Sequence, residues 1–226
     1  MSLRRGYLVL FLLPLLALAG ACSAATPAAD AVTGDESADI AKAAKGPDEA
    51  AAGERLLGQP PEGWRQTGAT NTKALRRASY VPEDEAAGSE WIQQIVFEAM
   101  VLDPLPDPIE FIDTLSADRD RDCGTFEQLP TFAGDENGYP TAVFLMICHK
   151  DRESQSSEVM LMKTIQGKEA FYLVSRARRG EPIPEGGEAP VSEEEIAGWA
   201  LFLRSIGLCD DGRAEHPCPA PVESVE

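Results

Sequence analysis

An α+β fold, an antiparallel sheet with flanking helices, is what this sequence predicts for its folded part. Three runs of alternating apolar residues, at 141–150, 158–166 and 169–177, are separated only by a polar loop and a tight turn. Such spacing is typical of an antiparallel meander. Helix start signals stand on both sides of the meander, at Asp107-Pro108 before it and at Ser192 after it. Strands grouped together with helices outside them predict an α+β domain.

Two extended segments are expected before the first helix. The segment 74–81 is predicted to be extended and to stop at Pro82, and an acidic turn follows it. The run 91–102 is apolar at both odd and even positions, a pattern that also fits a helix. Its β-branched and aromatic residues favour a central strand covered on both faces.

Two helices are predicted from their caps. Asp107 is a preferred N-cap residue and Pro108 a preferred first residue, so a helix is expected over about 109–119. Ser192 and Glu195 have the spacing of a capping box, so a second helix is expected to begin there and to end near Gly207. The residues expected to face the core are Phe111, Ile112 and Leu115 in the first helix, and Ile196, Trp199, Leu203 and Ile206 in the second.

The chain divides into four parts by composition. Residues 1–21 are predicted to be a signal peptide, because Arg4 and Arg5 precede an apolar run at 7–19. A helix over that run would rise about 20 Å, which is shorter than the roughly 30 Å hydrocarbon core of a bilayer. A permanent transmembrane helix is therefore not expected here. Residues 22–55 have almost no bulky apolar side chain, so a disordered tether is expected. The α+β domain is placed at 56–218 and a flexible tail at 219–226.

The sequence Leu18-Ala19-Gly20-Ala21-Cys22 resembles the lipobox of bacterial lipoprotein precursors, with Ala19 where leucine is usual. The resemblance implies a lipid anchor that includes palmitate on Cys22. Ser23 after the cysteine implies the outer membrane, with the domain facing the periplasm. Ala19-Gly20-Ala21 also fits ordinary signal peptidase cleavage, which would give a soluble periplasmic or secreted protein.

The net charge of −18 makes nucleic acid an unfavourable partner, because like charges repel. A protein or a small ligand is left as the expected partner class, besides the membrane at Cys22. Three arginines, Arg176, Arg178 and Arg179, end the last alternating run. They could bind an anion, but protection of an exposed sheet edge is the commoner role of such residues and is what we expect.

Five cysteines in an exported chain predict disulfides. If Cys22 carries the lipid, four remain to pair. Cys148 shares strand parity with Phe144 and Met146, so it is expected on an apolar face, within reach of a cysteine that follows the first helix. The predicted pairs are Cys123–Cys148 and Cys209–Cys218.

No catalytic residue, metal site or cofactor is predicted. The common hydrolase, nucleotide-binding and redox motifs are absent from the sequence. His149 should point away from Cys148 on the opposite face of a strand, and His216 is expected in a flexible tail. The segment 118–122 has an aspartate at every second position, but it lacks the glycine and the final glutamate of an EF-hand loop. Cys209, His216 and Cys218 lack a fourth zinc ligand.

A second, looser resemblance covers about 64–178. The residues that carry it are Tyr80-Val81-Pro82, Glu85, Trp91, Ile95, Gln166-Gly167 and Phe171-Tyr172. They look like those of a family of small exported proteobacterial proteins of uncharacterised function. The resemblance implies an antiparallel sheet with flanking helices and brings no activity or site residue.

These features together predict a binding or envelope-interaction module; the alternative is an exported enzyme with no recognisable motif. The two hypotheses differ in the site they require. A deep polar pocket with converging acids would favour an enzyme, whereas an apolar groove or an exposed sheet edge would favour binding.

Overall fold

The computed structural model describes residues 53–86 and 90–219, apart from the side chain of Thr131. Cys22, the signal peptide and nearly all of the predicted tether and tail lie outside these residues. The elements, in chain order, are β1 (Glu54–Leu57), β2 (Trp64–Asn71), β3 (Leu75–Pro82), β4 (Gln93–Met100), α1 (Pro108–Asp122), β5 (Phe126–Glu136), β6 (Tyr139–Cys148), β7 (Ser157–Gln166), β8 (Phe171–Gly180), α2 (Glu193–Ser205) and β9 (Gly207–Asp210).

Within the described ranges, seven strands form an antiparallel sheet in the order β2-β3-β4-β8-β7-β6-β5. β1 and β9 pair separately as an antiparallel two-stranded ribbon. The predicted meander is present as β6-β7-β8, and the expected strand after Trp91 is β4. The fold is therefore sheet-dominated and of the α+β class.

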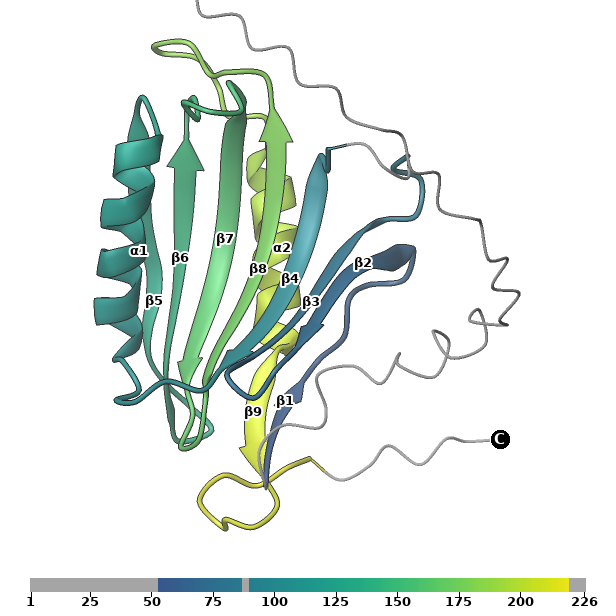
Figure 1. Cartoon of the computed structure of the whole chain (residues 1–226), viewed down its shortest axis with the longest axis vertical. Helices are drawn as coiled ribbons and strands as arrows, with labels where there is room; N and C mark the ends of the chain where they lie inside the picture. The colour runs from purple at the N-terminus through teal and green to yellow at the C-terminus, as the bar shows by residue number, and fades with distance from the viewer. Residues whose placement is uncertain (1–52, 87–89, 220–226) are drawn as a thin grey trace, which may run out of the picture. The chain divides into compact units, whose positions relative to one another are not determined.

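The two helices lie on opposite faces of the sheet, α1 over the side formed by β5 and β6 and α2 behind β7 and β8 (Figure 1). Alternation along the strands explains this arrangement, because successive side chains point to opposite faces. On β4, for example, Ile95 and Phe97 belong to the core under α2, while Val96 faces the other side. We call the two sides the α2 face and the α1 face.

Both predicted helix caps are confirmed. The Asp107 side chain accepts hydrogen bonds from the backbone N–H groups of Ile109 and Glu110. Ser192 and Glu195 form the reciprocal capping box. In α2, Trp199 and Leu203 are buried, as expected.

Both predicted cysteine pairs lie at disulfide distance, with Cα atoms 5.6 Å apart for Cys123–Cys148 and 4.8 Å apart for Cys209–Cys218. The first joins the end of α1 to the end of β6, and the second closes the loop after β9. Cys148 is buried on the apolar α1 face, as its strand parity predicted.

The predicted edge role of the last alternating run is wrong. β8, which carries Arg176, Arg178 and Arg179, lies between β4 and β7 in the middle of the sheet. Arg176 lies over the rings of Trp64 and Trp199, at 5.2 and 5.4 Å from their centroids. Strand order depends on pairing between segments far apart in the sequence, so the run itself does not indicate whether it is central or at an edge.

Two expectations at the ends of the domain are also corrected. β1 begins at Glu54, inside the predicted tether, and the Glu54 side chain is buried. His216 was expected in a flexible tail but is 3% exposed. Its ring stacks on Tyr139 at 4.0 Å and its Nδ1 lies 2.8 Å from the carbonyl oxygen of Asn137.

Among the described residues, no helix is long and apolar enough to cross a membrane.

Candidate functional site

A hollow of about 360 Å³ lies on the α1 face, between α1 and the strands β3, β4, β7 and β8. We call it the α1-face groove. Its floor consists of side chains that point to this face from β4, β7 and β8, and α1 forms one wall. The apolar residues that line it are Val96, Phe111, Leu115, Met160, Met162, Leu173 and Ala177.

The groove exists because α1 covers only part of its face. The helix packs on β5, β6 and β7, and it reaches β8 where the rings of Phe111 and Phe171 lie 4.6 Å apart. Phe111 and Leu115, expected to be fully buried, are half-buried and line the groove with one side. Met160 on β7 is likewise half-buried. Apolar surface thus remains accessible beside the helix.

One nearly buried carboxylate is shared by two arginines at the groove. Glu158, with 9% of its side chain exposed, lies opposite Arg179 in the pairing of β7 with β8. Arg179 Nε donates to Glu158 Oε2 at 3.1 Å, and Arg119 Nη2, from α1, donates to Oε1 at 3.3 Å. Glu158 and its two arginines therefore tie the helix to the sheet.

A second ion pair joins Arg77 Nη1 to Glu98 Oε1 at 3.1 Å across β3 and β4. Burial raises the pKa of Glu98 above its ordinary value, and Arg77 opposes that rise. The two acids of the groove are thus each held by arginine, and its lining contains neither histidine nor cysteine. The geometry differs from that of a pair of free carboxylates poised for acid–base catalysis.

A smaller hollow of about 220 Å³ adjoins the groove and shares Trp91, Gln94 and Arg179 with it. The guanidinium of Arg179 lies 3.8 Å from the centroid of the Trp91 ring, a cation–π contact. Glu85 holds the segment that carries Trp91, because its carboxylate accepts from the N–H groups of Ile92 and Gln93. Trp91, expected within the core strand, is half-buried just before β4 begins.

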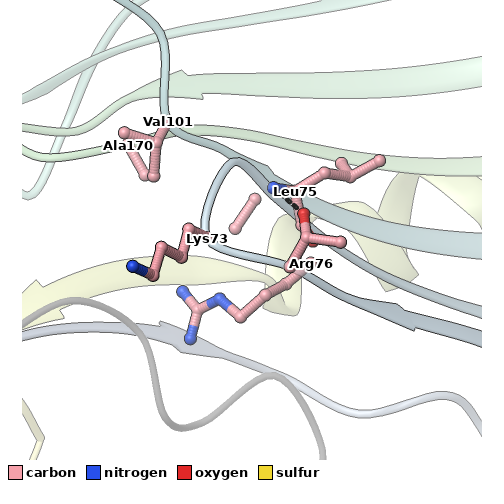
Figure 2. A pocket seen from close by; sticks show the side chains of 7 residues that line it. Lys73, Leu75, Arg76, Val101 and Ala170 are labelled. Carbon is pink, nitrogen blue, oxygen red and sulfur yellow. Dashed lines mark hydrogen bonds between the residues drawn. The ribbon is translucent and has the colours of Figure 1, made fainter.

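A third hollow, of about 210 Å³, lies near the turn between β2 and β3. Figure 2 shows Lys73 and Arg76 beside Leu75, with Val101 and Ala170 nearby. Arg76 has an interaction partner of its own, so it is not a free charge in this hollow. This hollow is smaller than the α1-face groove and lacks its shared carboxylate.

A buried polar cluster fixes the β1–β9 ribbon to the sheet. Glu54 accepts from the backbone N–H groups of Lys168 and Glu169, in the turn between β7 and β8, and from the Tyr172 hydroxyl. Burial, and then the Glu54 carboxylate, raises the pKa of both Tyr139 and Tyr172 well above the ordinary value. Tyrosine is already protonated at neutral pH, and the raised pKa keeps both phenols neutral at higher pH as well.

The two histidines and the aspartates of the segment 118–122, weighed above as site residues, do not line the groove. His149 pairs with Glu127 at 2.6 Å, and His216 packs near the β1–β9 ribbon. The aspartates of the segment 118–122 lie on α1, and Asp118 pairs with Arg121. In the part of the chain that the structure describes, no three metal-ligating side chains gather at one point.

Sequence analysis named Phe111, Leu115 and Arg179, but it did not predict the groove that they line. It did not single out Glu158, Met160 or Met162. One signal was present: Glu158 has the parity of Met160 and Met162, so it places an acid on an otherwise apolar strand face. A charged side chain at a buried position is almost always paired with an opposite charge. Glu158 therefore indicated a basic partner, but the sequence did not indicate which residue it would be.

No protein-family model matches the chain, and no curated protein matches it. Among solved structures it is similar to the Ran-binding protein Mog1p of Saccharomyces cerevisiae, with 10% identity and a TM-score of 0.45, over 72% of this chain and 98% of that one. It is also similar to LpqN of Mycobacterium tuberculosis, a protein involved in cell envelope biogenesis, with 10% identity and a TM-score of 0.41, over 71% and 85% of the two chains. Likeness at this level carries no conclusion about family, ligand or partner.

Proposed function

We propose that this protein is a binding module held at the cell envelope, and that it holds its ligand in the α1-face groove. The observation that carries the proposal is the apolar lining of the groove, half-buried at Phe111, Leu115 and Met160, next to paired charges. Ligand sites are typically concave and mostly apolar, with a few polar groups that orient the ligand, and occupy about 300–1,000 Å³. The groove, at about 360 Å³, falls in this range.

The envelope location is the part of the proposal that rests on sequence. The lipobox-like segment before Cys22 supports a lipid anchor there, and the small-residue pattern at 19–21 leaves secretion as the alternative. Palmitate labelling and membrane fractionation of Cys22→Ser test this part. The substitution is expected to abolish labelling and to release the protein from the membrane fraction. If labelling and fractionation match the wild type, the anchor is not at Cys22.

The groove is tested with N-phenylnaphthylamine, a neutral apolar dye whose fluorescence rises in apolar surroundings. Met160 is half-buried in the floor, so Met160→Glu places a charge where the dye would lie. Leu201→Glu is the matched control, because Leu201 is 65% exposed on α2 and outside the groove. All proteins carry the full chain with Cys22→Ser, so the contribution of residues 1–52 cancels.

We expect the dye to bind the reference chain and the Leu201→Glu variant alike, and Met160→Glu to bind it at least tenfold more weakly, since burying a charge against apolar groups is costly. Circular dichroism and a thermal melt establish that each variant is folded. Equal dye binding by a folded Met160→Glu variant would show that the groove is not the binding site.

A further inference from the structure

The charges around Glu158 do not balance. Two guanidinium groups, those of Arg119 and Arg179, share the Glu158 carboxylate at the groove, and each arginine side chain is about one-third exposed. The backbone N–H of Ser154 and, more weakly, Arg119 lower the pKa of Asp151, but Asp151 is not part of the groove lining. The whole lining of the α1-face groove holds three arginines and two glutamates, in a chain of net charge −18. The groove is thus a locally cationic place on an acidic protein.

The described residues of the chain satisfy only a few of the donors on these two arginines. A guanidinium has five N–H donors. Within the described residues, Arg119 bonds through Nη2 alone and Arg179 through Nε alone, both to Glu158. The guanidinium carbon of Arg179 also lies 3.8 Å from the centroid of the Trp91 ring. Both side chains line the groove.

An apolar floor begins next to this cationic end. Met160 and Met162 follow Glu158 on the same face of β7, and Leu173 lies on the same face of β8. Methionine adapts its shape to different apolar partners. A ligand that satisfies both regions has an apolar body and one anionic head. A cationic head would face an excess of arginine, and a neutral head would leave the excess charge unpaired.

We propose that the α1-face groove takes a small amphiphilic monoanion, a medium-length acyl carboxylate in type, whose head binds Arg119 and Arg179 and whose chain lies on the methionine floor. This inference rests on the proposed function and names the ligand class of that groove. A volume of about 360 Å³ is at the lower end of ligand sites, which favours a medium chain over a long one.

Displacement of N-phenylnaphthylamine by three ligands with the same ten-carbon chain tests the head group. Sodium decanoate is expected to displace the dye at lower concentration than decan-1-ol, and decyltrimethylammonium to be the weakest. Raising the salt concentration should weaken the binding of decanoate and leave the binding of decan-1-ol unchanged, since ions screen charge pairs. If the alcohol or the cation competes as well as decanoate, the proposal for an anionic ligand is wrong.

Two substitutions assign the head to the arginines. Arg119→Met keeps the apolar stem and leaves Glu158 paired with Arg179; it is expected to weaken decanoate about tenfold, the loss of one charge-assisted hydrogen bond. Decanol should be unaffected. Arg204→Met is the matched control, since Arg204 is exposed on α2. Unchanged decanoate affinity in a folded Arg119→Met variant would overturn the assignment.

Glu158→Gln provides the opposite change. Glutamine removes the competing carboxylate and frees both arginines, so the affinity for decanoate relative to decan-1-ol should rise several-fold. A damaged fold would raise dye and decanol binding too, so it is distinguishable from the expected result. An unchanged or lower affinity for decanoate relative to decan-1-ol in a folded variant contradicts the inference. If the dye itself does not bind the groove, the proposed function fails; if only the head-group preference is absent, the inference alone fails.

Discussion

A buried lysine on β7 is expected to hold the carboxyl end of α2. Lys163 is 1% exposed, and its ammonium donates to the carbonyl oxygens of Leu203 at 3.2 Å and Ile206 at 2.6 Å, as well as to the Glu136 carboxylate. The last carbonyl groups of a helix lack partners within the helix and attract positive charge. Lys163→Met keeps most of the length of the side chain, which ends one atom earlier, and removes all three bonds.

The magnitude follows from what each acceptor loses. The Leu203 carbonyl keeps a second donor, the backbone N–H of Ile206. Glu136 is 38% exposed and is rehydrated. The main loss is therefore the charge-assisted bond to Ile206, about 1.5–3 kcal/mol, together with a weaker one to Leu203. Methionine avoids the cost of burying an ammonium, which offsets part of this loss. We expect the free energy of unfolding to fall by about 2–3 kcal/mol.

Urea denaturation followed by circular dichroism measures this change, with the slope against urea expected to stay the same. Lys168→Met is the matched control, because Lys168 is exposed in the turn between β7 and β8 and should change stability by at most about 0.5 kcal/mol. Glu136→Gln should cost less than Lys163→Met, since both carbonyl groups keep their lysine. A loss below about 0.5 kcal/mol for Lys163→Met would refute the capping role.

Three further outcomes are expected. Replacing Cys123 and Cys148 with serine opens a loop of sequence separation 25 and should lower stability by about 3.5 kcal/mol in the chain-entropy model, measured by urea denaturation. Burial raises the pKa of Glu98 above its ordinary value of 4.5, so ionised Glu98 destabilises the folded state at pH values above the folded pKa. Below pH 4.5 the carboxyl is protonated in both the folded and the unfolded chain, and this cost disappears. Glu98→Gln should therefore raise the melting temperature at pH 7, and the gain should vanish below about pH 4. Trp91→Ala should cost about 1–2 kcal/mol, because the half-buried ring loses mainly its contact with Arg179, whereas Trp199→Ala in the core should cost about 3–5 kcal/mol by the same thermal melts.

The helix starts and the meander were predictable because their signals are local. Asp107 and Ser192 cap helices through backbone groups two or three residues away. Alternation in the segments 141–150 and 158–166 places each side chain on one face whatever the strand pairs with. The same parity predicted that Cys148 would face the apolar side, where Cys123 meets it.

The strands that escaped prediction have weak local signals. β2 is mostly polar, and pairing with β3 holds it at the edge of the sheet. β5 contains Pro130, which argues against a strand when only the sequence is considered, and its pairing with β6 has a register shift. An edge strand tolerates both features. The burial of His216 depends on Tyr139, far away in the sequence. In each case a partner distant along the chain supplies the stabilising contact.

By itself, the sequence determined the class of fold, the helix caps and the acidic charge, because each depends on composition or on spacing within a short segment. It also predicted the two cysteine pairs, which lie at disulfide distance in the structure. Only the tertiary structure decided that β8 is central and that Arg119 and Arg179 meet at Glu158. It also decided where α1 stops covering its face and leaves Met160 accessible. These features depend on strand order and on the position of a helix over the sheet, which arise from contacts between residues that the chain keeps far apart.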